Sequence, residues 1–156
     1  PELAATCRFL MIGGRNTSFD RDLESLLHQL NRPNLAVLPA TDAPLSYYRA
    51  ADLFVCSSYE ESLPRVIMEA MAACVPILST DVHGIRDLLP DQNHAVLMPP
   101  GNSQAVCDGL CCMLSNPSQA TLRTAAARDR VVTHFNAATL LPRHVALAAC
   151  VASNRS

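Results

Sequence analysis

Lysine is absent from this sequence of 156 residues, and all 12 basic residues are arginine. Schiff-base catalysis and the P-loop phosphate site each need a lysine, so both are excluded. A strong charge of either sign is also missing, because the net charge is -2 and like charges form no block. We therefore expect no surface for nucleic acid or for anionic lipid.

Paired cysteines are missing as well. The seven cysteines are odd in number and lack the C-x-x-C spacing of zinc and redox sites. Most lie in apolar runs, and Cys107, Cys111 and Cys112 recur at helical spacing, which predicts small buried residues in a reducing compartment. Without a signal pattern or an apolar run of membrane-spanning length, we expect a cytoplasmic protein with no transmembrane segment and no metal.

What the sequence does contain is a regular alternation of short apolar runs and helical patterns. Strands are predicted at the runs RFLMI, LAVLP, LFVCS, PILST and AVLMP. The first of these strands is predicted to end in a turn at Gly13 and Gly14. Thr17 and Asp20 resemble a capping box, so a helix is predicted to follow Thr17. Further helices are predicted at 47–51, 85–89, 103–114 and 120–135, with another around Glu69 and a last one from about 138. This alternation predicts a doubly wound, Rossmann-like α/β fold with a parallel sheet.

One carboxylate, Glu69, interrupts the apolar run VIMEAMAACV. Pro64 suits the first position of the predicted helix, which leaves the N–H groups of Arg65 and Val66 free to bind phosphate. A buried, unpaired carboxylate is costly, so Glu69 needs a partner. This partner is either a pair of ligand hydroxyls or Arg65, in an ion pair worth about 0.3 kcal/mol. Glu61 in the preceding loop favours the ligand, because two acids then flank a phosphate site.

Residues 50–102 resemble the signature of the retaining, nucleotide-sugar-dependent glycosyltransferases of family 4, which have the GT-B fold. Glu61 and Glu69 match the E-x7-E motif of that family, and EAMA is found in both. VPILST resembles the family strand P-V-V-A-T, GIRDLL stands at G-x-x-E-(I/V/L), and AVLMPPGN resembles G-L-L-V-P-P-G-D. The resemblance extends more weakly upstream through FLMIGG and downstream to the region of Phe135.

The resemblance implies a role for each matched residue. Glu69 would accept hydrogen bonds from the ribose of a UDP- or GDP-sugar donor. Glu61 would lie beside the donor sugar and the departing diphosphate and act in catalysis. The sugar and the diphosphate would contact the backbone of Ser62, Leu63, Arg65 and Val66. The base would lie near 38–42, and no metal or cofactor is implied. Residues 1–135 would form a partial nucleotide-sugar-binding domain, followed by a helix and tail at 136–156.

The sequence departs from the family pattern at three positions. Cys74 and His83 stand where the family has glycine, and Asp87 replaces a glutamate. His83 is interpreted as a surface-loop residue. The family also has a separate N-terminal domain that binds the acceptor, and a first strand and helix that bring an Arg and a Lys to the diphosphate. Arg15 follows the second family strand and is not assigned that role.

In the strand order of the family, 3-2-1-4-5-6, the first strand is central. This chain is expected to lack that first strand and the helix after it, which would leave a gap between the strands RFLMI and LFVCS. We expect either that the sheet closes across this gap or that another chain supplies the strand. The leading hypothesis is the donor-binding half of a retaining glycosyltransferase, which would depend on an acceptor-binding domain or chain for catalysis. The alternatives are a non-catalytic nucleotide-binding or interaction module derived from that domain, and a doubly wound domain for another phosphate ligand.

Overall fold

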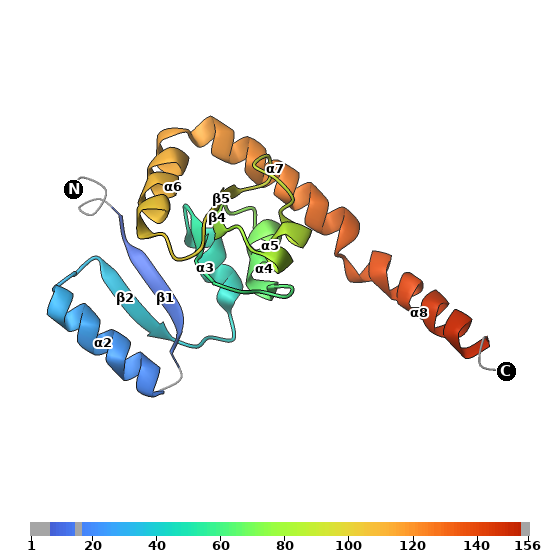
Figure 1. Cartoon of the computed structure of the whole chain (residues 1–156), viewed down its shortest axis with the longest axis horizontal. Helices are drawn as coiled ribbons and strands as arrows, with labels where there is room; N and C mark the ends of the chain where they lie inside the picture. The colour runs from blue at the N-terminus through green and yellow to red at the C-terminus, as the bar shows by residue number, and fades with distance from the viewer. Residues whose placement is uncertain (1–6, 15–16, 154–156) are drawn as a thin grey trace. The chain divides into compact units, whose positions relative to one another are not determined.

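The computed structural model describes residues 7–14 and 17–153. In chain order the elements are β1 (Phe9–Gly14), α2 (Ser18–Leu30), β2 (Leu35–Pro39), α3 (Pro44–Ala50), β3 (Phe54–Cys56), α4 (Arg65–Ala72), β4 (Ile77–Thr80), α5 (His83–Leu88), β5 (Val96–Met98), α6 (Ser103–Ser115), α7 (Pro117–His134) and α8 (Ala137–Ser153). The chain divides into two compact units, Pro1–Pro44 and Leu45–Ser156 (Figure 1). Every predicted strand and helix is present, with ends that differ by no more than three residues.

All strand pairings are parallel, which confirms the predicted α/β class. The strands that the structure describes form two sheets, β1-β2 and β3-β4-β5, and no ladder joins them. A single continuous sheet is therefore not formed by the described residues.

In the first unit, the predicted capping box at the start of α2 is confirmed. The Thr17 backbone N–H donates to Asp20 Oδ2 at 2.7 Å, and the Asp20 N–H donates to Thr17 Oγ1 at 3.3 Å. The helix ends at Asn31, whose φ of 46° is left-handed. The prediction of a turn at Gly13 and Gly14 is wrong, because β1 runs through both residues with a register shift at this point.

The core of the second unit is built around β4, whose four residues are all buried. Helices α4, α5 and α7 each bury one apolar stripe in this core. Their buried residues are Ile67, Ala70 and Met71 in α4, Gly84, Ile85 and Leu88 in α5, and Ala120, Ala127 and Val131 in α7. A parallel strand covered on both faces has no solvent-facing side, which explains the continuous apolar pattern of PILST.

Helix α4 begins at Arg65, so Pro64 is its N-cap and not, as predicted, its first residue. After the C-cap Ala73, the chain leaves the helix through a left-handed residue, Cys74, with φ 58°. The Cys74 N–H donates to Met71 O at 3.2 Å and the next N–H donates to Ala70 O at 3.1 Å. These two bonds form a Schellman motif, in which the left-handed position favours glycine. This left-handed conformation explains why the family has glycine at the position, and in this chain Cys74 adopts it.

The prediction that the cysteines are buried is wrong for most of them. Cys56 is buried and Cys7 is partly buried, whereas the other five are exposed and all seven are free thiols. In α6 the residues that face the core are Gly109 and Met113. Cys107, Cys111 and Cys112 lie on the exposed side of that helix, because an apolar run longer than the buried stripe places part of its residues outside.

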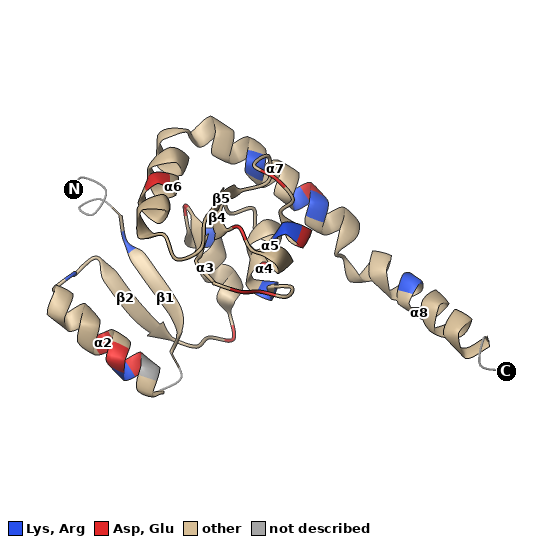
Figure 2. Cartoon of the chain, in the orientation of Figure 1, with Lys and Arg blue, Asp and Glu red and all other residues tan. Residues whose placement is uncertain are grey.

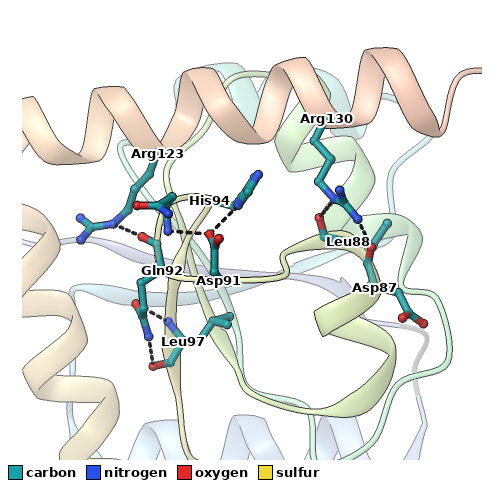
Figure 3. Close-up of polar contacts among 9 residues, drawn as sticks. Asp87, Leu88, Asp91, Gln92, His94, Leu97, Arg123 and Arg130 are labelled. Carbon is teal, nitrogen blue, oxygen red and sulfur yellow. Dashed lines mark hydrogen bonds and ion pairs between the residues drawn. The ribbon is translucent and has the colours of Figure 1, made fainter.

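Two arginines tie helix α7 to the end of α5 and to the loop that follows it (Figure 3). Arg130 donates from Nε to Leu88 O and from Nη2 to Asp87 O, both at 2.8 Å. Arg123 Nε donates to Gln92 O at 2.8 Å. Charged hydrogen bonds to these carbonyls fix the segment that leads into β5.

Helix α8 extends from the end of α7 and buries none of its residues (Figure 1). Its one charged residue is Arg143, whereas α2 and α7 each carry both acidic and basic residues (Figure 2). By length and composition alone, the stretch Pro117–Ser153 would be long and apolar enough to cross a membrane. One such stretch is weak evidence for a membrane segment.

Candidate functional site

The loop between β3 and α4 holds the first candidate acid, Glu61. Ser58 Oγ donates to Glu61 Oε1 at 2.7 Å, and Thr80 Oγ1 donates to Ser58 O at 2.7 Å. Thr80 is the last residue of β4 and is 2% exposed. The carboxylate of Glu61 is therefore connected, through one serine, to the buried central strand.

The same loop packs tightly against the start of α5. The Gly84 N–H donates to Glu61 O at 3.1 Å. A Cβ atom on Gly84 would lie 2.1 Å from Ser62 O and 2.3 Å from Glu61 O, well inside van der Waals contact. Only glycine allows this close approach of two backbone segments. The glycine of the GIRDLL segment thus sets the position of the Glu61 loop.

An open pocket of about 680 Å³ lies at the carboxyl ends of β3 and β4. It is lined by Tyr59, Glu60, Glu61, Ser62, Val82 and His83. This is the edge at which parallel α/β sheets bind ligands. The lining carries two carboxylates and one histidine but no arginine, so it suits a neutral polyhydroxylated group better than a phosphate.

A phosphate is better served by the N-terminus of α4. The N–H groups of Ile67 and Met68 both donate to Pro64 O, at 3.1 and 3.4 Å. Within the described residues, the N–H groups of Arg65 and Val66 donate to no acceptor. The first turn also contains no acidic residue. Two free amides at the positive end of the helix dipole match the chemistry of a diphosphate.

The second candidate acid, Glu69, is half-buried rather than fully buried. Its Oε2 accepts a hydrogen bond of 3.2 Å from the hydroxyl of Tyr48 on α3. The alternative of an ion pair with Arg65 is not found in the described part of the chain, where that arginine is exposed. The expectation that Glu69 has a partner is confirmed, and the protein partner is a tyrosine.

The structure brings together only part of the predicted site. Glu61 and Ser62 line the pocket, Arg65 and Val66 stand at the helix N-terminus, and Leu63 is 46% exposed between them. Glu69 does not line that pocket. The segment 38–42, predicted to meet the base, belongs to the other compact unit, and Arg15 lies outside the described residues.

Sequence reasoning missed the residues that hold the two acids. Ser58 lies three residues before Glu61, a local spacing that suggests a hydrogen bond. Tyr48 and Thr80 are separated from their partners by 21 and 22 residues, and no local pattern indicates these contacts. His83, interpreted as a surface-loop residue, is exposed as expected but begins α5 and lines the pocket.

Among the described residues, no three His, Cys, Asp or Glu side chains gather as metal ligands would. A second pocket, of about 950 Å³, lies at the opposite edge of the sheet, where Asp52 and Pro76 precede β3 and β4. Its lining on α6 and α7 is mostly apolar, and Arg128 is engaged there with Ala72 O at 2.8 Å and Cys74 Sγ at 3.2 Å. The candidate site is therefore the pocket beside Glu61.

Solved glycosyltransferases share this fold. Sucrose-phosphate synthase from Thermosynechococcus elongatus matches 93% of this chain and 38% of its own chain, with a TM-score of 0.85 and 24% identity. HepE from Anabaena, solved in complex with UDP, matches 95% of this chain and 43% of its own, with a TM-score of 0.86 and 19% identity. The C-terminal domain of LpcC, a glycosyl transferase group 1 protein from Francisella tularensis, covers 78% of this chain at a TM-score of 0.65. The fold is that of the C-terminal, Rossmann-like half of a GT-B glycosyltransferase.

Sequence comparison identifies the family. The model of the glycosyl transferases group 1 matches residues 1–116, and the chain belongs to this family. The D-inositol 3-phosphate glycosyltransferase of Xylanimonas cellulosilytica is 32% identical over 127 residues, and the capsular polysaccharide biosynthesis glycosyltransferase CapM of Staphylococcus aureus is 24% identical over 129. The chain spans 30% and 34% of the lengths of these two relatives.

Proposed function

We propose that this chain binds the donor of a retaining glycosyltransferase of family 4, which transfers a sugar from a UDP- or GDP-sugar to an acceptor. The observation that carries the proposal is that two carboxylates, each fixed by a hydrogen bond, accompany a helix N-terminus whose first N–H groups have no acceptor. Glu61 is fixed by Ser58, Glu69 is fixed by Tyr48, and between them α4 presents two unpaired amides. Family membership and the UDP complex of HepE support a nucleotide-sugar donor.

In this proposal each group meets the part of the donor that suits its charge. The diphosphate contacts the amides of Arg65 and Val66, which are positive in character. The sugar occupies the pocket beside Ser62, Leu63 and Glu61, where the carboxylate stabilises the positive charge that develops at the anomeric carbon. Glu69 accepts hydrogen bonds from the ribose hydroxyls. No step requires a metal, and retention is tested by comparing the anomeric configuration of donor and product.

The proposal extends to the surroundings of the site. Residues 1–135 form the partial nucleotide-sugar-binding domain, and 136–156 form a C-terminal helix and tail. An acceptor-binding domain or chain completes the enzyme, because transfer needs the acceptor held against the sugar carbon. Seven free thiols fit a reducing compartment, which supports a cytoplasmic location.

Calorimetric titration of the purified protein with UDP and with GDP tests the donor site. We expect one of the two to bind, and Glu69→Ala to lose most of that binding while its thermal unfolding stays cooperative. Glu24→Ala is the matched control, because Glu24 is an exposed acid on α2 with no hydrogen bond in the described structure. Binding that survives Glu69→Ala would contradict the ribose role of this residue.

The second candidate is a non-catalytic module that keeps the fold. His83 favours it, because a side chain stands in the pocket where the family has glycine. A folded protein that binds neither UDP nor GDP would support this module over the transferase.

A further inference from the structure

The proposed function uses the fact that Tyr48 holds Glu69 but gives the tyrosine itself no part in donor binding. The contact joins α3 to α4 across 21 residues of sequence, through a hydrogen bond of 3.2 Å from the tyrosine hydroxyl to Oε2. Within the described structure the other carboxylate oxygen, Oε1, accepts no side-chain hydrogen bond. The carboxylate is thus held at one oxygen and open at the other.

The ring of Tyr48 is itself firmly placed. It packs edge-on against Phe54 of β3, with centroids 5.4 Å apart and planes at 61°, and it lies against the buried core. Burial, followed by the nearby Glu69 carboxylate, raises the pKa of Tyr48 above its ordinary value of 10.0. The hydroxyl therefore keeps its proton at neutral pH and acts as a donor to Glu69.

We propose that Tyr48 is a positioning residue for donor binding, whose hydroxyl holds Oε2 of Glu69 so that Oε1 is presented to the ribose. This inference rests on the proposed function. A glutamate side chain has several rotatable bonds, and a ligand that must order it loses affinity. The tyrosine orders the carboxylate before the ligand arrives. Oε2 keeps a free lone pair, so each ribose hydroxyl can find an acceptor on this carboxylate.

The variant Tyr48→Phe removes the hydroxyl and leaves the ring against Phe54. Titration compares the nucleoside diphosphate that the parent binds, UDP or GDP, with its 2′,3′-dideoxy form. We expect the variant to bind the ribonucleotide about two- to tenfold more weakly and the dideoxy nucleotide as the parent does. The ratio of the two affinities is measured on one folded sample, so a general loss of stability does not change it.

Tyr47→Phe provides the control, because Tyr47 is the neighbouring tyrosine on α3 and its hydroxyl makes no hydrogen bond within the described residues. We expect both of its affinities to equal those of the parent. Equal weakening of both nucleotides by Tyr48→Phe would mean a structural effect only and would overturn the inference, as would unchanged or tighter ribonucleotide binding. A parent that binds but does not prefer the ribonucleotide would also overturn it. A folded parent that binds neither UDP nor GDP would refute the proposed function, and the inference with it.

Discussion

Replacement of Gly84 by alanine is the sharpest stability test of the Glu61 loop. The new Cβ would lie 2.1 Å from Ser62 O and 2.3 Å from Glu61 O, whereas a carbon and a carbonyl oxygen in contact are about 3.3 Å apart. Both obstacles are backbone atoms, so no side-chain rotation relieves the clash. The loop must move by about 1 Å, and the hydrogen bond from the Gly84 N–H to Glu61 O is stretched or lost.

The expected cost of Gly84→Ala follows from these two effects. Overpacking of a tight contact costs about 1–3 kcal/mol, and an unsatisfied backbone group adds about 1–3 kcal/mol. The better helix propensity of alanine returns about 1 kcal/mol. We therefore expect the free energy of unfolding to fall by about 1–5 kcal/mol, with a middle value of about 3 kcal/mol, which is a large part of the stability of an ordinary domain.

Urea denaturation of the parent and the variant measures this loss as a lower midpoint at an unchanged slope. Gly109→Ala is the matched control, since its Cβ would lie 2.5 Å from the Cδ1 atom of Leu78, the end of a flexible side chain. We expect this control to lose less than Gly84→Ala, because a side chain and not the backbone meets the new Cβ, although Leu78 is buried, and because α6 gains helix propensity. A Gly84→Ala variant as stable as the parent would refute the close approach of the two backbone segments.

Three further outcomes are expected. Cys74→Gly raises the free energy of unfolding by about 0.5–1 kcal/mol, because glycine adopts the left-handed φ of 58° without strain. A variant that unfolds at a lower temperature than the parent would show that the contact of the Cys74 thiol with Arg128 stabilises the protein more than the relief of strain does. Ser58→Ala frees the Glu61 carboxylate and lowers the transfer rate of the complete enzyme about tenfold while donor affinity changes less, which kinetics with and without the substitution measure. Burial and then Glu69 raise the pKa of Tyr48 above 10.0, so the unfolded chain releases this proton first and the free energy of unfolding falls as pH rises above that value. Between about pH 9 and about pH 11, the urea midpoint of the parent should therefore fall further than that of Tyr48→Phe. An equal fall in the two proteins would count against the buried hydrogen bond.

Much of the fold and part of the site could be predicted from local patterns. The alternation of apolar runs with helical segments is a property of neighbouring residues, and so is the capping box between Thr17 and Asp20. The pairing of Glu61 with Glu69 around a helix N-terminus follows from their spacing and from Pro64. Each of these features depends on residues within two or three turns of one another.

The failures have an equally physical origin. Apolar character does not tell which side of α6 faces the core, so Cys107, Cys111 and Cys112 were expected inside and lie outside. Gly13 and Gly14 predict a turn, but the ladder with β2 carries the strand through both. In each case contacts from another element decide the outcome.

By itself, the sequence determined the α/β class, the order of the elements and the two acids that the family motif requires, because these depend on period and spacing along the chain. Only the tertiary structure decided how the acids are held. Tyr48 reaches Glu69 from α3, and Gly84 meets the Glu61 loop from α5. Packing between elements selects such partners from many residues of suitable chemistry, and that selection is made in three dimensions.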